Sequence, residues 1–187
     1  MITKKKMMKN LFYLSLLFFT VQCSPKPDQT VIQFKGKPEV PSSLKKTHSE
    51  LLQQLHQFIL IKDSSATVAL KLEELMLHHF LEEEDYILPP LGLLPSLAKG
   101  QLAERQRKII MLSEKAKSQI DHMSAEHQLI TAYIEELKQA SAEENQPAII
   151  AFEKEVSKHA LSEEEVYFPA GIMVGEYLKL KSELKSN

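Results

Sequence analysis

Histidine and glutamate side chains, which bind metal ions, recur at a regular spacing in this sequence. His79 and Glu83 are four residues apart, as are His159 and Glu163. Four residues of an α-helix give a rise of about 6 Å and a net rotation of about 40°, so both side chains of a pair can reach one point. Burying a carboxylate without a partner costs several kcal/mol of folding free energy, so such groups are usually paired or bound to a metal. The two pairs are therefore candidate metal ligands.

The two pairs belong to an internal repeat. A single histidine precedes each pair, His48 by 31 residues and His127 by 32. The pairs are offset by 80 residues, and so are the prolines that follow them, Pro89 and Pro169. Each half thus contains a helix with one histidine and then a helix with His-x-x-x-Glu. Two such halves, related by a pseudo-two-fold axis, would bring four imidazoles and two carboxylates to one interior point.

Six such ligands suit a pair of metal ions better than a single ion, because the carboxylates can bridge while the imidazoles cap each metal. Imidazole and carboxylate without thiolate favour iron or manganese, with zinc as a further option. Ferritin-like di-iron proteins instead carry Glu-x-x-His and isolated glutamates. The reversed order and spacing in this chain argue against that class.

The elements that must position these ligands are helices. Leu, Glu, Lys, Ala and Met dominate the body of the chain, and apolar residues recur with helical periodicity, with one histidine on each apolar face. The predicted fold is an all-α, antiparallel four-helix bundle with a short C-terminal helical tail. The expected helices cover residues 42–62, 64–88, 101–140 and 147–168, and the tail covers 172–184. Pro89 and Pro169 are expected to end helices, and Gly92–Gly100 is the loosest connection.

Several motifs together resemble the HHE hemerythrin-like domain family over about residues 41–169. They are His48, His79-Phe80-x-x-Glu83-Glu84 leading to Pro89, Glu126-His127, and His159-x-x-x-Glu163-Glu164 leading to Tyr167-Phe168-Pro169. The resemblance implies a non-haem di-iron centre inside the bundle. It also implies that Glu83 and Glu163 are bridging carboxylates, and that the four histidines of the repeat are terminal ligands.

Other residues near the motifs are weaker candidates for the metal site. Oxygen-carrying hemerythrins use a fifth histidine, but the residue one turn before His127 is Met123. His122 is the candidate for an additional metal ligand. Glu126 is a candidate to hydrogen-bond one of the ligands without binding the metal itself. Two further histidines are expected at the surface, and three tyrosines either border the centre or pack in the core. These are His56, His78, Tyr86, Tyr133 and Tyr167.

The N-terminus is expected to be a targeting segment. Four lysines precede an apolar stretch over residues 11–21, which is too short to span a bilayer but is typical of a signal peptide. The stretch ends at Thr20-Val21-Gln22-Cys23-Ser24, which resembles a bacterial lipobox. Cys23 is the single cysteine of the chain, so it cannot form an internal disulfide. The prediction is a lipoprotein signal peptide (1–22), a lipid on Cys23, a proline-rich tether (23–41) and a helical domain (42–187) in the bacterial cell envelope.

Three functions remain open at this point. The first is a di-iron protein that binds or senses oxygen or nitric oxide. The second is a di-iron enzyme that reduces peroxide or nitric oxide, or releases iron for repair. The third is a metal-free helical interaction module. Nucleic acid is not an expected partner, because the net charge is −2 overall and −6 once the four lysines of the first 22 residues are set aside.

Overall fold

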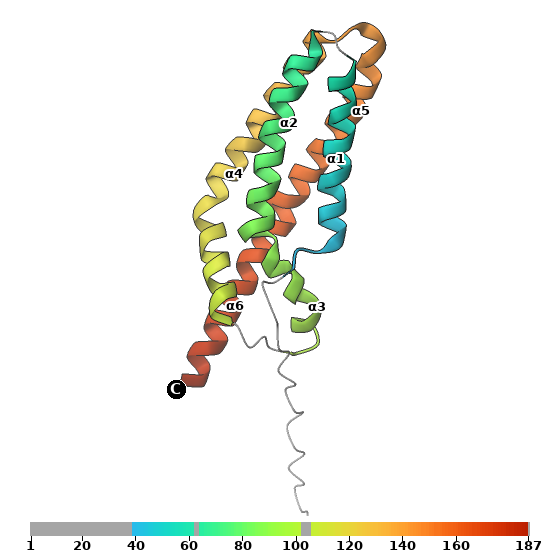
Figure 1. The fold of residues 1–187 in the computed structure, drawn as a ribbon. Helices are drawn as coiled ribbons and strands as arrows, with labels where there is room; N and C mark the ends of the chain where they lie inside the picture. The colour runs from blue at the N-terminus through green and yellow to red at the C-terminus, as the bar shows by residue number, and fades with distance from the viewer. Residues whose placement is uncertain (1–38, 62–63, 102–105, 187) are drawn as a thin grey trace, which may run out of the picture.

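The computed structural model describes residues 39–61, 64–101 and 106–186, and these residues are helical almost throughout. Figure 1 shows a helical bundle that is elongated along its helix axes. No β-strand occurs in the described part, and the predicted all-α bundle is confirmed. The principal helices are α1 (Ser42–Leu60), α2 (Ser65–Glu82), α4 (Gln106–Ala140), α5 (Gln146–Ser162) and α6 (Phe168–Ser186).

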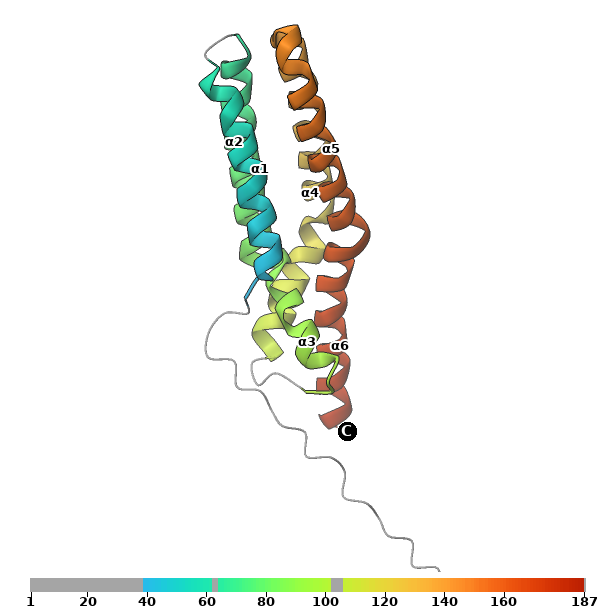
Figure 2. The ribbon, with the colours of Figure 1, turned by 90° about the vertical axis from the view of Figure 1, so that its right-hand side faces the viewer.

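The bundle consists of two helix pairs that pack face to face. Figure 2 shows α1 beside α2 on one side, with α4, α5 and α6 on the other. Helix α1 buries a single apolar stripe that contains one histidine, as its spacing predicts. The buried residues of this stripe are Leu44, His48, Leu51, Leu55 and Phe58.

A widened helical turn follows each His-x-x-x-Glu pair. Segments η1 (Glu83–Ile87) and η4 (Glu163–Tyr167) are π-helical, and each begins at the glutamate of its pair. The backbone N–H of Leu88 donates to the carbonyl of Glu83 at 2.9 Å, five residues back, where an α-helix would use four. Such single π turns occur mostly where a functional side chain must be re-aimed.

The fourth helix does not stop before Pro169, contrary to the prediction. Helix α5 passes through η4 directly into α6, in which Pro169 is the second residue. Proline breaks a helix interior because it lacks an N–H, but it is tolerated in a first turn. The π turn creates such a start by resetting the hydrogen-bond pattern. Helix α6 therefore contains the predicted C-terminal tail as its later part.

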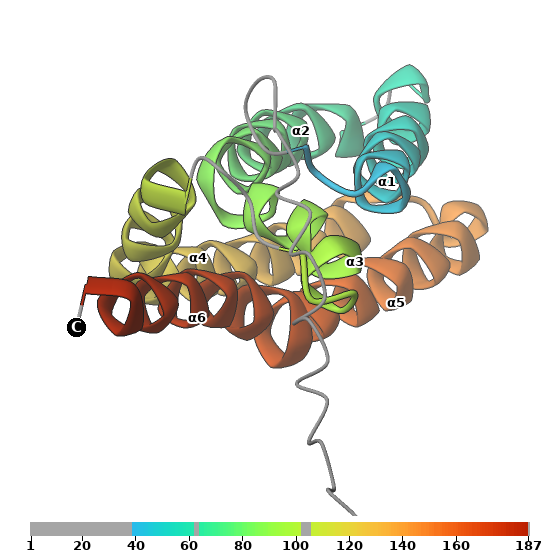
Figure 3. The same cartoon turned by 90° about the horizontal axis from the view of Figure 1, so that it is seen from below.

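The first half continues differently after its π turn. Two consecutive prolines begin a 3₁₀ segment, η2 (Pro89–Leu93), which leads into the one-turn helix α3 (Leu94–Leu97). The connection expected to be loose is therefore partly helical, and Leu91 and Leu93 are buried. Gly100 has φ +73°, a left-handed conformation that glycine adopts readily. Figure 3 shows α3 lying across the lower end of the bundle.

The apolar core has separate parts above and below the histidines. The upper part fills the space between the four bundle helices, and the lower part is closed by η1, η2 and the start of α6. The histidines and glutamates of the repeat therefore lie between two apolar layers. The largest upper residues are Phe58, Met76, Phe80 and Phe152, and the lower ones include Leu44, Tyr86, Met123 and Phe168.

The predicted signal peptide, Cys23 and the tether up to residue 38 lie outside the described residues, as does the expected start of the third helix at residues 102–105. Helix α4 is described from Gln106 onward. Among the described helices, none combines the length and the apolar character that crossing a bilayer requires.

Candidate metal centre

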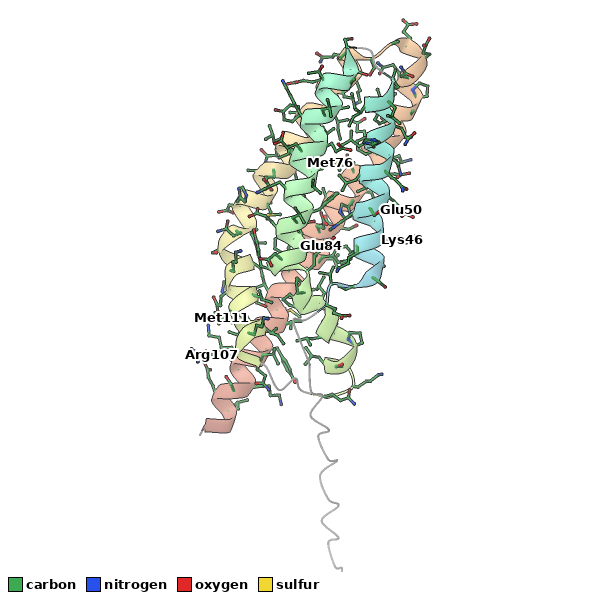
Figure 4. All side chains as sticks on the ribbon, viewed as in Figure 1. Lys46, Glu50, Met76, Glu84, Arg107 and Met111 are labelled. Atoms are coloured by element: carbon green, nitrogen blue, oxygen red, sulfur yellow. The ribbon has the colours of Figure 1, made fainter. Side chains whose placement is uncertain are left out.

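The structure brings the six predicted ligands together at mid-height in the bundle. Helices α1, α2, α4 and α5 each supply one histidine, and each π turn supplies one glutamate. All six side chains are buried, and both glutamates are completely so. Figure 4 labels Met76 and Glu84, which bracket this level along α2 and η1. The ligands are His48, His79, Glu83, His127, His159 and Glu163.

One set of donors is centred on His48 and His159. Nε2 of His48 lies 3.3 Å from Oε2 of Glu83 and 3.6 Å from Oε1 of Glu163. Nε2 of His159 lies 2.8 Å from the same Oε1 of Glu163. Two imidazole nitrogens and one oxygen from each carboxylate thus face a common point.

The second set uses the other oxygen of each carboxylate. Nε2 of His79 lies 3.4 Å from Oε1 of Glu83, and Nε2 of His127 lies 3.4 Å from Oε2 of Glu163. The two Nε2 atoms are 3.0 Å apart. Adjacent donors of an octahedral ion are about 3 Å apart when each lies about 2.1 Å from the metal. Both sets therefore match the spacing of ligands around one metal each.

In the described structure, six of the eight donor atoms lack a hydrogen-bond partner. Nε2 of His48, Nε2 of His159 and all four carboxylate oxygens of Glu83 and Glu163 are buried without a hydrogen bond in the described structure. The short contact between His159 and Glu163 lacks hydrogen-bond orientation. Buried polar atoms almost always have a hydrogen-bond partner. A buried cluster of imidazole nitrogens and carboxylate oxygens without such partners can instead be paired by a cation. The residues present therefore fit metal ions.

Comparison with protein families agrees with this geometry. The family model described as hemerythrin HHE cation binding domain matches residues 42–171, which is more than half of the chain. This chain belongs to the hemerythrin HHE family. The searches of curated proteins and of solved structures found no match.

The two carboxylates of this hemerythrin-family centre differ in protonation when no metal is bound. Burial, together with the neighbouring charge of Glu163, raises the pKa of Glu83 well above its usual range. Burial also acts to raise the pKa of Glu163, but the imidazoles of His127, His159 and His48 outweigh it and hold that pKa well below its usual range. In the metal-free centre, Glu83 therefore takes up a proton at a higher pH than Glu163 does.

A ring of further carboxylates orients three of the imidazoles. Nδ1 of His48 lies 2.9 Å from Glu84, and Nδ1 of His127 lies 2.8 Å from Glu164. Nδ1 of His79 lies 2.9 Å from Glu126. An Nδ1–H that donates to a carboxylate fixes the tautomer, so Nε2 is left to bind metal and becomes a stronger donor.

The sequence makes Glu126 a candidate to hydrogen-bond a metal ligand. In the structure it lies beside the candidate ligand His79. Glu84 and Glu164 were not assigned a role, because in an α-helix each would point about 100° away from the preceding glutamate. The π turn brings both neighbours to the centre. The signal in the sequence was the Glu-Glu pair at the same place in both repeats.

His159 is the exception among the four imidazoles, since no carboxylate among the described residues pairs with its Nδ1. The repeat explains this difference. Glu126 directly precedes His127, whereas Thr47 directly precedes His48, and the hydroxyl of Thr47 donates to the carbonyl of Ser43 at 3.1 Å. Thr47 and His159 line a cavity of about 260 Å³ that opens at the surface.

The remaining candidates lie away from the buried ligands. His122 is exposed, and its Nε2 is 3.2 Å from Glu82 rather than at the centre. His56 and His78 are exposed as well, and His56 contacts Glu73 of α2 at 2.9 Å. Met123 is buried where a fifth histidine would lie, and its sulfur accepts a hydrogen bond from the hydroxyl of Tyr86. Tyr133 and Tyr167 are partly buried against the apolar layers.

Proposed function

We propose that this protein is a non-haem di-iron protein of the bacterial envelope that binds or senses oxygen or nitric oxide. The observation that carries the proposal is the sharing of Glu83 and Glu163 between two donor sets, each completed by two imidazoles. In this arrangement His48 and His159 would hold one iron, and His79 and His127 would hold the other. Glu83 and Glu163 would be shared by the two positions.

The donor chemistry supports iron over other metals. Each position has two nitrogens and two oxygens and no sulfur, which suits iron or manganese more than zinc or copper. Membership in a cation-binding family supports the same assignment. A pair of reduced irons with free coordination positions supplies reversible binding of a diatomic ligand.

Two phenylalanine rings of the chain cover imidazoles of the centre. The ring of Phe80 stacks on His48 with 4.1 Å between ring centroids, and the ring of Phe168 lies nearly parallel to His127. The apolar layers close the centre above and below. Apolar walls admit a small uncharged ligand and hold the imidazole planes in place.

The envelope location rests on the sequence. A lysine-rich start, an apolar stretch and Cys23 together are typical of a bacterial lipoprotein. A lipid on Cys23 would hold the domain at a membrane surface by the tether up to Pro41. Replacing Cys23 with serine should move the protein from the membrane fraction to the soluble fraction, and an unchanged distribution would contradict the anchor.

Metal content tests the central proposal. The protein is purified without metal-binding tags, and elemental analysis is combined with absorption spectra before and after exposure to air. About two irons per chain and a band that changes reversibly with oxygen or nitric oxide are the expected results. A folded, helical protein without metal would instead support an interaction module.

The buried side chain of Met123 favours a second candidate function, that of a di-iron enzyme. A buried thioether occupies the place of the fifth histidine of oxygen carriers, so both donor sets contain two imidazoles. Such a centre would reduce peroxide or nitric oxide, or release iron for repair. Sustained turnover of peroxide or nitric oxide with an electron donor would establish this activity, and ligand binding without turnover would exclude it.

A further inference from the structure

A second group of histidines and glutamates lies at the surface between α2 and α4. The spacing His-x-x-x-Glu occurs there twice more, as His78 with Glu82 on α2 and as His122 with Glu126 on α4. The two helices run antiparallel and pack against each other (Figure 1). Both pairs therefore present an imidazole and a carboxylate to the same strip of surface.

Donor atoms of three of these residues, His78, Glu82 and Glu126, lie close together, and Nε2 of His122 contacts both carboxylates. Nε2 of His122 lies 3.2 Å from Oε2 of Glu82 and 3.6 Å from Oε1 of Glu126. Nδ1 of His78 lies 3.7 Å from the same Oε1 of Glu126. Donors of His78, Glu82 and Glu126 all lie within 4.8 Å of one another, a spacing that a single metal ion can span.

We propose that His78, Glu82, His122 and Glu126 bind one divalent transition metal ion, separate from the buried pair. Two imidazoles and two carboxylates without thiolate are borderline donors, which select ions such as zinc or ferrous iron over calcium and magnesium. Zinc accepts nitrogen and oxygen donors of this kind and has no redox chemistry, so it is the probe for this site.

The surroundings leave the two carboxylates free for a cation. Within the described ranges no lysine or arginine pairs with Glu82 or Glu126, and their ionic contacts are to histidines. Glu126 is nearly buried, which holds its carboxylate in place, whereas His78 and His122 are 64% and 47% exposed and can adjust to an ion.

The other half of the molecule provides an internal comparison. The repeat offsets place Lys158 and Ser162 opposite His78 and Glu82, and Ser43 and Thr47 opposite His122 and Glu126. Lys158, Ser162 and Thr47 lie around one cavity, so the equivalent surface exists. It carries a lysine and three hydroxyls, which do not form a metal site. The surface site is thus a property of one half and not a product of the shared fold.

Glu126 connects the surface site to the buried centre. Its Oε1 faces His78 and His122, while its Oε2 lies 2.9 Å from Nδ1 of His79. A metal ion on Oε1 withdraws negative charge from the hydrogen bond to His79, which makes that imidazole a weaker donor. This coupling, unlike the surface site, rests on the proposed iron pair.

Zinc binding to a full-length chain with a disabled centre tests the site alone. The double variant E83Q/E163Q is dialysed against zinc and should bind one ion. Its derivative with His78→Lys and His122→Ser, the residues of the other half, should bind none. Equal zinc in both proteins would overturn the site, provided circular dichroism shows both to be helical.

The chain with an intact centre gives a second test of zinc binding, which does not need the E83Q/E163Q substitutions. The otherwise unaltered chain should bind one more zinc ion than H78K/H122S, and both should keep the same iron content. Equal zinc stoichiometry would overturn the site. With iron loaded, zinc should shift the absorption bands of the unaltered chain and not those of H78K/H122S. An absence of the shift, with the extra zinc bound, would overturn the coupling alone.

Discussion

The two halves of the bundle contribute the same ligands to the centre but surround them differently. Helices α1 and α2 with η1 supply two histidines and a bridging glutamate, and so do α4 and α5 with η4. Outside this set, the first half has Thr47 where the second has Glu126, and it has His78 where the second has Lys158. The buried chemistry is therefore symmetric, while the layer around it is not.

This difference shows which positions the fold constrains. Each bridging carboxylate faces both donor sets, so neither can change without disturbing both metal positions. Glu84, Glu126 and Glu164 each pair with one of the four buried imidazoles, so substitutions there should affect one metal position only. The comparison therefore predicts equal effects on metal binding where the two halves match and unequal effects where they differ.

The largest effect is expected from Glu83→Ala and from Glu163→Ala. Each removes one oxygen from both donor sets, so each variant should fall from two metal ions per chain to one or none. Elemental analysis after desalting measures this. If either variant kept both ions, the bridging assignment would be wrong.

The outer glutamates that match between the halves should have smaller, equal effects. Glu84→Ala and Glu164→Ala each leave one imidazole without its carboxylate, which should weaken metal binding by about 10- to 100-fold. Competition with a chelator measures the affinity. Glu50→Ala is the control, because Glu50 is exposed on α1 and, among the described residues, forms its ion pair with Lys46 (Figure 4). A weakening confined to one of the two variants would contradict the symmetry.

In the metal-free protein, the bridging glutamates should respond oppositely to neutralisation. The raised pKa of Glu83 means that its contribution to stability is present below the usual carboxyl pKa and is lost as pH rises through the folded-state value. The lowered pKa of Glu163 means the reverse, with stability present above the usual pKa and lost as pH falls through the folded-state value.

At neutral pH, Glu83→Gln should therefore raise the free energy of unfolding of the metal-free protein, and Glu163→Gln should lower it. Each change should be about 1–3 kcal/mol, the usual cost of an unsatisfied buried polar group. Urea unfolding in the presence of a chelator measures both. Changes of the same sign would show that the two carboxylates are equivalent without metal.

The smallest effect should come from making the halves more alike. Thr47→Glu places a carboxylate at the position equivalent to Glu126, where it can accept from Nδ1 of His159. The metal ion held by His48 and His159 should then be released more slowly to a chelator, with an affinity gain of about tenfold or less. Thr47→Val is the matched control. An unchanged release rate would mean that the cavity beside His159 already satisfies the imidazole with water.

The helical bundle and the positions of the six ligands on its inner faces were predictable from the sequence. The stripe of α1 contains the residues that its periodicity selected, since period and burial are linked in an amphipathic helix. The repeat added the symmetry, because two offsets of nearly equal length require two similar halves.

The π turns were not predictable in the same way. A shift from four to five residues in the hydrogen-bond pattern has no characteristic residue type, so the motifs that contain Glu84 and Glu164 do not reveal which imidazoles they contact. The same shift explains why Pro169 begins a helix instead of ending one. The surface group at His78 and His122 depends on the packing of α2 against α4, which the spacing along either helix does not specify.

The π turns also let the chain hold one extra residue in each half without disturbing the packing that follows. A π turn uses one residue more than an α turn, because its hydrogen bonds run five residues back instead of four. The extra residue of Glu163–Tyr167 is taken up within that turn. Val174 and Leu178 of α6 therefore remain on the face that is buried together with Ile109 of α4. Deleting one residue there would restore regular α-helix and change the turn around Glu163, while the rotational phase of α6 would stay nearly the same.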